Sequence, residues 1–159
     1  MHALRLSGGL AAVLFTGLAW VLAPLEPGVL ALQFAFTPRA FASIVHVWPP
    51  EHLALYRAHL PVDFLLLAAY GSFGWLLASR TTLFAGLRAS LRRVAAWVLP
   101  LAASFDAVEN GLHWWLTAAP RFGLPALYAL AAAAAALKWL LLLLFGALVV
   151  HAMLGEAAH

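Results

Sequence analysis

The chain has 159 residues, of which 65% are hydrophobic and only 9% are charged, with nine Lys or Arg, six Asp or Glu, and no cysteine. Soluble domains carry roughly 45–50% apolar and about 25% charged residues, so this chain cannot build a water-facing surface. The lack of cysteine excludes disulfides, thiolate metal sites and iron–sulfur clusters. A formal net charge of +3 is too small to indicate nucleic-acid binding. The composition therefore predicts an integral membrane protein.

Four apolar segments are long enough to cross a bilayer as helices, which takes about 20 residues at roughly 1.5 Å rise each. They cover about residues 6–25, 61–79, 94–117 and 125–150. We expect α-helices because lipid offers no hydrogen-bond partner to an open sheet edge. The proline and glycine of the short turn at 118–124 predict that the last two helices are antiparallel neighbours. The predicted fold class is all-α, a polytopic four-helix bundle forming one domain over residues 1–159.

The first segment has an alternative interpretation as a cleaved secretory signal peptide. Arg5 precedes its apolar run, and small residues lie near Ala31. The run is longer than the about 7 to 15 apolar residues of a signal peptide, and three remaining helices would make a thin bundle. We therefore favour an uncleaved membrane anchor.

The arginines predict the orientation, because cytoplasmic loops carry an excess of Lys and Arg. The side with both termini would hold Arg5, Arg80, Arg88, Arg92 and Arg93, and the other side would hold Arg39, Arg57 and Arg121. Both termini are therefore predicted to be cytoplasmic. The segment 81–93 reads as a basic cytoplasmic loop.

The outer connection is predicted to form an amphipathic helical hairpin over about residues 37–60. Thr37 is a good N-cap with Pro38 at the first helical position, and apolar residues follow at helical spacing. Pro49 and Pro50 end this first helix, and a second helix would lead through Pro61 into the next span.

We expect this hairpin to lie as a lid in the membrane interface on the non-cytoplasmic side. Its aromatic residues Phe36, Trp48 and Tyr56 would then lie at the depth of the lipid headgroups.

The run of alanines from Ala131 to Ala136 in the fourth span has small side chains that let another helix approach closely. The run predicts either packing within the chain or a homo-oligomer interface.

Charged residues inside membrane spans cost about 2.5–3.5 kcal/mol each on insertion scales, so each needs a partner or a function. The third span carries four polar residues at positions i, i+3, i+4 and i+7, on one helix face. These are Asp106, Glu109, Asn110 and His113. The fourth span contributes Lys138, and the second contributes Asp63 near its outer end.

The helical rise predicts which of these residues meet. Counted from the outer ends of their spans, Lys138, Asp106 and Glu109 lie about 20, 16 and 12 Å deep. The lysine leans outward and the carboxylates lean inward, so the three can meet near the midplane. His113 and Asp63 would form a shallower tier, at about 6 and 3 Å. A kink at Pro100 would open space beside Asp106.

Three interpretations of these residues remain open. In the first, Lys138 pairs with Asp106 or Glu109 and the polar set fixes helix packing, as in a structural or accessory subunit of a larger membrane assembly. One lysine then serves two carboxylates, which leaves one of them protonated or bound to something else. In the second, the residues form a proton or ion pathway that includes Asp63 and His113.

The third interpretation, our working hypothesis, is a pocket that binds a lipophilic small molecule or acts on it by acid/base chemistry. Asp106 or Glu109 would be the proton donor or acceptor, Lys138 the counter-charge and Asn110 the orienting hydrogen bonder. Further binding residues would be Asp63, Tyr70, His113, Trp114 and Trp139. No cofactor is predicted. No metal is predicted either, because the Glu109–His113 spacing differs from the Glu-x-x-His spacing of di-iron bundles.

Several of these residues also form motifs. They are Leu32 to Pro38 before the hairpin, Asp63 with Tyr70, Phe105-Asp106-x-x-Glu109-Asn110, and Lys138-Trp139. Over Leu32 to Trp139 the chain resembles an uncharacterised family of small four-span bacterial and archaeal membrane proteins. The family pattern differs at Ala31, where it has an acidic residue, and at Leu66-Leu67, where it has Phe-Pro. The resemblance supports the predicted topology and the choice of residues, and it implies no particular reaction. We expect a multi-pass protein of the bacterial inner (plasma) membrane.

Overall fold

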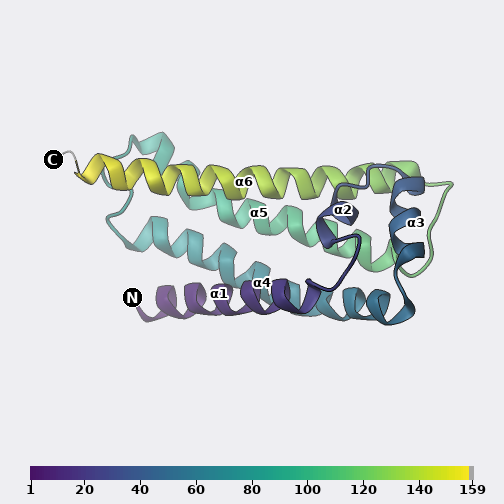
Figure 1. Ribbon diagram of the computed structural model, residues 1–159. Coiled ribbons are helices and arrows are strands. Elements are labelled where there is room, and N and C mark those ends of the chain that lie inside the picture. Colours follow the sequence, from purple (N-terminus) through teal and green to yellow (C-terminus); the bar gives the residue numbers. More distant parts are fainter. Residues whose placement is uncertain (158–159) are drawn as a thin grey trace.

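The computed structural model describes residues 1–157, and over this range the chain consists of helices and connecting loops (Figure 1). In chain order the helices are α1 (His2–Leu22), α2 (Val29–Gln33), α3 (Pro38–Val47), α4 (Pro50–Arg80), α5 (Ala89–Leu116) and α6 (Pro125–Ala157). The all-helical prediction is therefore confirmed for the described residues.

Three helices are long and apolar enough to cross a membrane: α1, α4 and residues Pro125–Gly155 of α6. The predicted span at 94–117 corresponds to α5 up to its last residue, Leu116; this helix has 28 residues and is long enough but less apolar. The difference arises because α5 carries the acidic, amide and imidazole side chains singled out above. The predicted span at 61–79 is the second part of α4, since Pro61 lies inside a continuous 31-residue helix.

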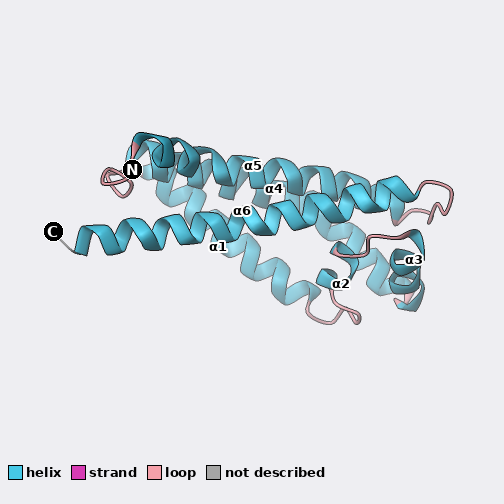
Figure 2. Cartoon of the chain, turned by 90° about the horizontal axis from the view of Figure 1, so that it is seen from above, coloured by secondary structure: helices cyan, strands magenta, loops and turns pink. Residues whose placement is uncertain are grey.

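The long helices form a row in which α5 packs against α4 on one side and α6 on the other, while α1 packs against α4. Within the described residues no comparably extensive contact joins α1 to α6, so the row is not closed into the predicted four-helix bundle. The reason lies in α1, which has no buried residue and therefore no second packing face. Both termini and the α4–α5 connection lie at one end of the row, and α3 lies at the other (Figures 1 and 2).

Residues 24–48, which we call the lid, fold back over the α3 end of the row. Thr37 caps α3 by accepting a hydrogen bond from the backbone N–H of Ala40 at 3.2 Å, as predicted. The second arm of the predicted hairpin is the first part of α4, which begins at the proline pair 49–50 and continues through Pro61 into the next span, as predicted. The lid also contains α2, a short helix that the sequence did not predict.

The lid is held by a buried apolar core rather than by lipid headgroups. Phe41 and Trp48 of the lid pack with Tyr56 of α4 and Tyr128 of α6. Trp48 and Tyr56 are only 4% and 1% exposed, so their side chains pack inside the protein, whereas Phe36 is 48% exposed. The Trp48 indole N–H donates to the carbonyl of Pro27 at 2.9 Å, which satisfies its one polar group inside the protein.

The half of the molecule near the termini has an entirely apolar core. Its buried residues, which we call the apolar layer, are Phe84, Ala95, Val98, Leu99, Phe145, Leu148 and Ala152. The alanine run of α6 is used within the chain as well, because most of its side chains are buried: Ala131, Ala132, Ala134 and Ala135.

Helices α4 and α5 approach closely at Gly74, where a Cβ atom would lie 2.5 Å from the Cβ of Leu99. Gly74→Ala is therefore expected to destabilise the protein by about 1–3 kcal/mol, because the added methyl forces the two helices apart. Gly146→Ala is the matched control, since a Cβ there meets nothing within 4 Å. Thermal unfolding in detergent measures both variants. An equal loss in both would show that the close approach does not limit packing.

Candidate functional site

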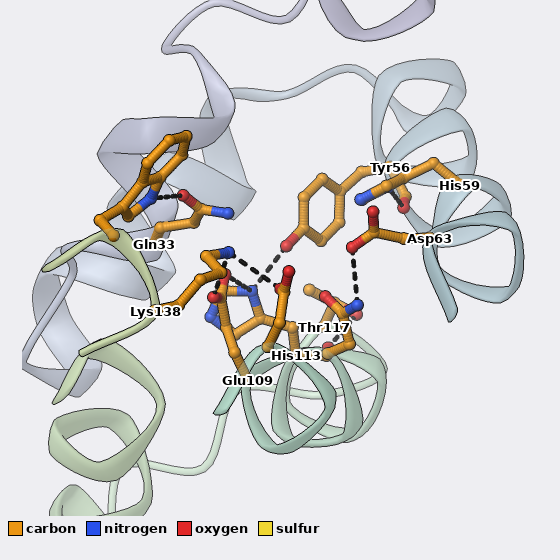
Figure 3. Close-up of polar contacts among 11 residues, drawn as sticks. Gln33, Tyr56, His59, Asp63, Glu109, His113, Thr117 and Lys138 are labelled. Atoms are coloured by element: carbon orange, nitrogen blue, oxygen red, sulfur yellow. Dashed lines mark hydrogen bonds and ion pairs between the residues drawn. The ribbon is translucent and has the colours of Figure 1, made fainter. Parts of the chain in front are cut away.

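The residues singled out in the sequence meet where α4, α5 and α6 converge beneath the lid (Figure 3). Helix α5 supplies four buried side chains from one face: Asp106, Glu109, Asn110 and His113. Lys138 reaches them from α6, and Asp63 and Tyr70 reach them from α4. We call these seven residues, together with Tyr56, the polar cluster.

The centre of the polar cluster is an ion triad. The Lys138 ammonium donates to Asp106 Oδ1 at 2.9 Å and to Glu109 Oε2 at 2.7 Å. All three side chains are less than a tenth exposed. The predicted meeting of Lys138 with both carboxylates is therefore confirmed. Tyr70 adds a hydrogen bond from its hydroxyl to Asp106 Oδ2 at 3.2 Å, so both oxygens of Asp106 have a partner.

Asp63 and Asn110 form a separate pair between α4 and α5. The Asn110 side-chain amide donates to Asp63 Oδ2 at 2.7 Å. Asp63 is partly exposed, whereas Asn110 is buried. A carboxylate at the edge of the buried region is thus joined to the face of α5 that carries the triad.

His113 extends the polar cluster toward the lid. Its Nδ1 atom is 2.6 Å from the hydroxyl of Tyr56, and its ring packs edge-on against Phe41 of the lid at 5.4 Å between centroids. The backbone carbonyl of Tyr56 is in turn hydrogen-bonded by Nδ1 of His59. Tyr56 and His59 thus belong to the surroundings of this site, although neither was predicted as a site residue.

Thr117, the C-cap of α5, continues this polar face, and the sequence prediction did not include it. Its hydroxyl lies 2.6 Å from the carbonyl of His113 and accepts a hydrogen bond from the Arg57 guanidinium at 2.9 Å. The signal for Thr117 was present, because it follows His113 by four residues and so continues the polar face.

One carboxylate oxygen of the triad has no hydrogen-bond partner. Glu109 Oε1 is buried and accepts no hydrogen bond from any described residue. Nδ1 of His113 lies 4.0 Å from this oxygen and already contacts Tyr56. Buried polar atoms almost always have partners, so an orphaned carboxylate oxygen needs an explanation in terms of a proton, a water molecule or a ligand.

The two tryptophans predicted as binding residues, Trp114 and Trp139, differ in their position relative to the triad. Trp139 lies beside the triad: the Lys138 ammonium is 5.6 Å from its ring centroid, and its indole N–H donates to Gln33 of the lid at 3.0 Å. Trp114 is 45% exposed, and the Arg57 guanidinium lies over its ring, so it does not line the polar cluster. One residue turns a helix by about 100°, which carries Trp114 off the face of His113.

Two shallow apolar grooves lie on the surface of the protein, and no residue of the polar cluster lines either of them. The larger, about 600 Å³, lies between α4 and α5 and is lined by Gly71, Trp75, Pro100 and Ala103 among others. Space therefore opens at Pro100, as predicted, although not directly against Asp106. Tyr70, which hydrogen-bonds Asp106, precedes the groove residue Gly71 in sequence but does not itself line the groove.

The arrangement can hold and transfer protons in an environment without bulk water. It contains two carboxyl groups, one ammonium and one imidazole within hydrogen-bonding or ion-pair reach of one another. In the described part of the chain, no three His, Asp or Glu side chains are grouped so as to hold a metal ion. Comparison of the chain with protein-family models, curated proteins and solved structures finds no match.

Proposed function

We propose that the protein is a four-span integral membrane protein of a bacterial inner membrane, with α5 as the fourth span. The position of α5 between two apolar membrane-length helices supports this topology. The arginines of the first turns of α1 and α5 and of the last turn of α4 gather at the end with both termini, which supports a cytoplasmic location for that end. The lid then lies on the outer side.

Within this topology, we propose that the polar cluster binds a lipophilic small molecule or acts on it by acid/base chemistry. The observation that carries the proposal is the orphaned Oε1 of Glu109. Lys138 balances one carboxylate, so the second requires a proton or a bound group that donates a hydrogen bond. Glu109 is the better candidate of the two, because both oxygens of Asp106 are already occupied.

The proposed roles follow from the contacts. Glu109 gives or takes the proton, and Lys138 holds the opposite charge. Asn110 orients Asp63, and Tyr56 orients His113 next to Glu109. A molecule arriving from the bilayer reaches the triad from the groove at Pro100, after displacing the hydroxyl of Tyr70 from Asp106.

A second candidate is a structural or accessory subunit without catalytic activity. It is favoured by the direct contacts of Lys138 with both carboxylates and by the fact that neither groove is lined by the polar cluster. In that case the triad serves to fix the register of α5 against α6.

Glu109→Gln separates the two candidates, because Gln keeps the shape and one acceptor for Lys138 but cannot exchange a proton. We expect it to leave the melting temperature in mild detergent nearly unchanged. The amount of co-extracted lipophilic molecule, measured by mass spectrometry, should fall about 10- to 100-fold, as expected when a charge-assisted hydrogen bond is lost.

Glu51→Gln is the matched control, since it makes the same chemical change at an exposed residue in the first turn of α4. It should change neither the melting temperature nor the amount of co-extracted lipophilic molecule. If Glu109→Gln lowers the melting temperature and leaves the set of co-extracted molecules as in the unmodified protein, the acid/base proposal fails and the structural candidate is supported.

A further inference from the structure

The second groove, between α5 and α6, combines an apolar floor with a cation at one end. It has a volume of about 440 Å³ and is lined by Ser90, Arg93, Trp97, Leu101 and Leu144 among others. The first two belong to the opening turns of α5, whereas Leu101 lies further along the helix, about 12 Å from Arg93 at the α-helical rise. The groove therefore has a polar end and an apolar end.

The apolar part of this groove faces outward and is not covered by the chain. Trp97 is 59% exposed, and Leu101 and Leu144 are 48% and 42% exposed. Such a surface is stable only against lipid or another apolar partner. In the proposed topology its polar end lies at the cytoplasmic surface, where lipid headgroups begin.

The charge at this end favours an anionic partner. Arg93 forms no salt bridge with any described side chain, so its guanidinium can bind another anion. Further arginines stand at the same end of the row, in and near the first turns of α5 and at the end of α4. Basic residues at the cytoplasmic surface attract anionic lipids, with about 1 kcal/mol for each Lys or Arg.

We propose that this groove binds one phospholipid with a net negative headgroup. The phosphate lies against the Arg93 guanidinium and the Ser90 hydroxyl, and an acyl chain follows Trp97, Leu101 and Leu144. Arginine suits this role because its planar fork of N–H donors matches phosphate oxygens. The inference rests on the proposed four-span topology but not on the acid/base role of Glu109, so each can fail without the other.

The test compares Arg93→Gln with Arg92→Gln. Both changes remove one positive charge, the two residues are adjacent and exposed, and only Arg93 lines the groove. The full-length protein is loaded with phosphatidylglycerol or phosphatidylcholine in mild detergent, and native mass spectrometry counts the lipids that stay bound. We expect one retained phosphatidylglycerol, about fivefold weaker retention in Arg93→Gln, and unchanged retention in Arg92→Gln.

Two further measurements complete the experiment. Arg93→Lys should keep most of the retention, which covers the case in which the glutamine variant does not fold. Trp97→Ala should weaken retention of both lipids, because it shortens the apolar floor. The proposal is overturned if both glutamine variants lose retention equally, if phosphatidylcholine is held as well as phosphatidylglycerol, if inorganic phosphate displaces the lipid, or if a second copy of the chain occupies the face instead.

Discussion

Lys138→Met is expected to destabilise the protein by about 3–5 kcal/mol, because removing one partner of a buried ion group leaves the others uncompensated. Among the described lysines and arginines, only Lys138 forms an ion pair with Asp106 and Glu109, and all three are buried. Met fills a similar volume but leaves two carboxylates without an opposite charge. Unfolding by denaturing detergent, followed by circular dichroism, measures the loss.

The same residues provide the control. The triple variant Lys138→Met, Asp106→Asn, Glu109→Gln removes the charges together, and neutral replacement of a whole buried ion group is often tolerated. We expect it to regain most of the lost stability. If Lys138→Met alone is as stable as the unmodified protein, then the triad is not a charge-balanced unit and the structural account of Lys138 is wrong.

Phe41→Ala is expected to release the lid, at a cost of about 3–5 kcal/mol in the stability of the docked state. Phe41 is 1% exposed and packs edge-on against both His113 and Tyr128, so its loss leaves a cavity between the lid and the polar cluster. Limited trypsin digestion detects the release, because Arg39 lies in the first turn of α3. Cleavage there should become much faster.

Phe36→Ala is the matched control for the lid, since Phe36 is in the same segment but is 48% exposed. It should leave the rate of cleavage at Arg39 nearly unchanged. Equally fast cleavage in both variants would indicate that the lid is held by its backbone and by Trp48 rather than by the Phe41 contacts.

The centre of the site could be predicted because a helix converts sequence spacing into geometry. The intervals between Asp106, Glu109, Asn110 and His113 place them on one face, and the helical rise brings Lys138 to the same depth. The same spacing rule places Thr117 on the polar face and Trp114 off it, because they follow His113 by four residues and by one.

The contacts from the lid could not be predicted in this way. Tyr56 meets His113 across 57 positions in sequence, and Gln33 meets Trp139 across 106. Such pairs leave no periodic signal, since they depend on how the lid folds back over the row. The aromatic residue Trp48, which composition alone assigns to the membrane interface, is buried for the same reason.

The apolar layer has a consequence for the energetics of any reaction at Glu109. All buried polar side chains of the described residues lie on the lid side of this layer: His59, Asp106, Glu109, Asn110, His113, Thr117 and Lys138. Among the described residues no buried polar side chain continues from the polar cluster into this layer, so we expect protons to exchange with Glu109 from the lid side. In the proposed topology, acid/base turnover that takes up and returns its proton on that side would move no net charge across the bilayer, so it should not generate a membrane potential.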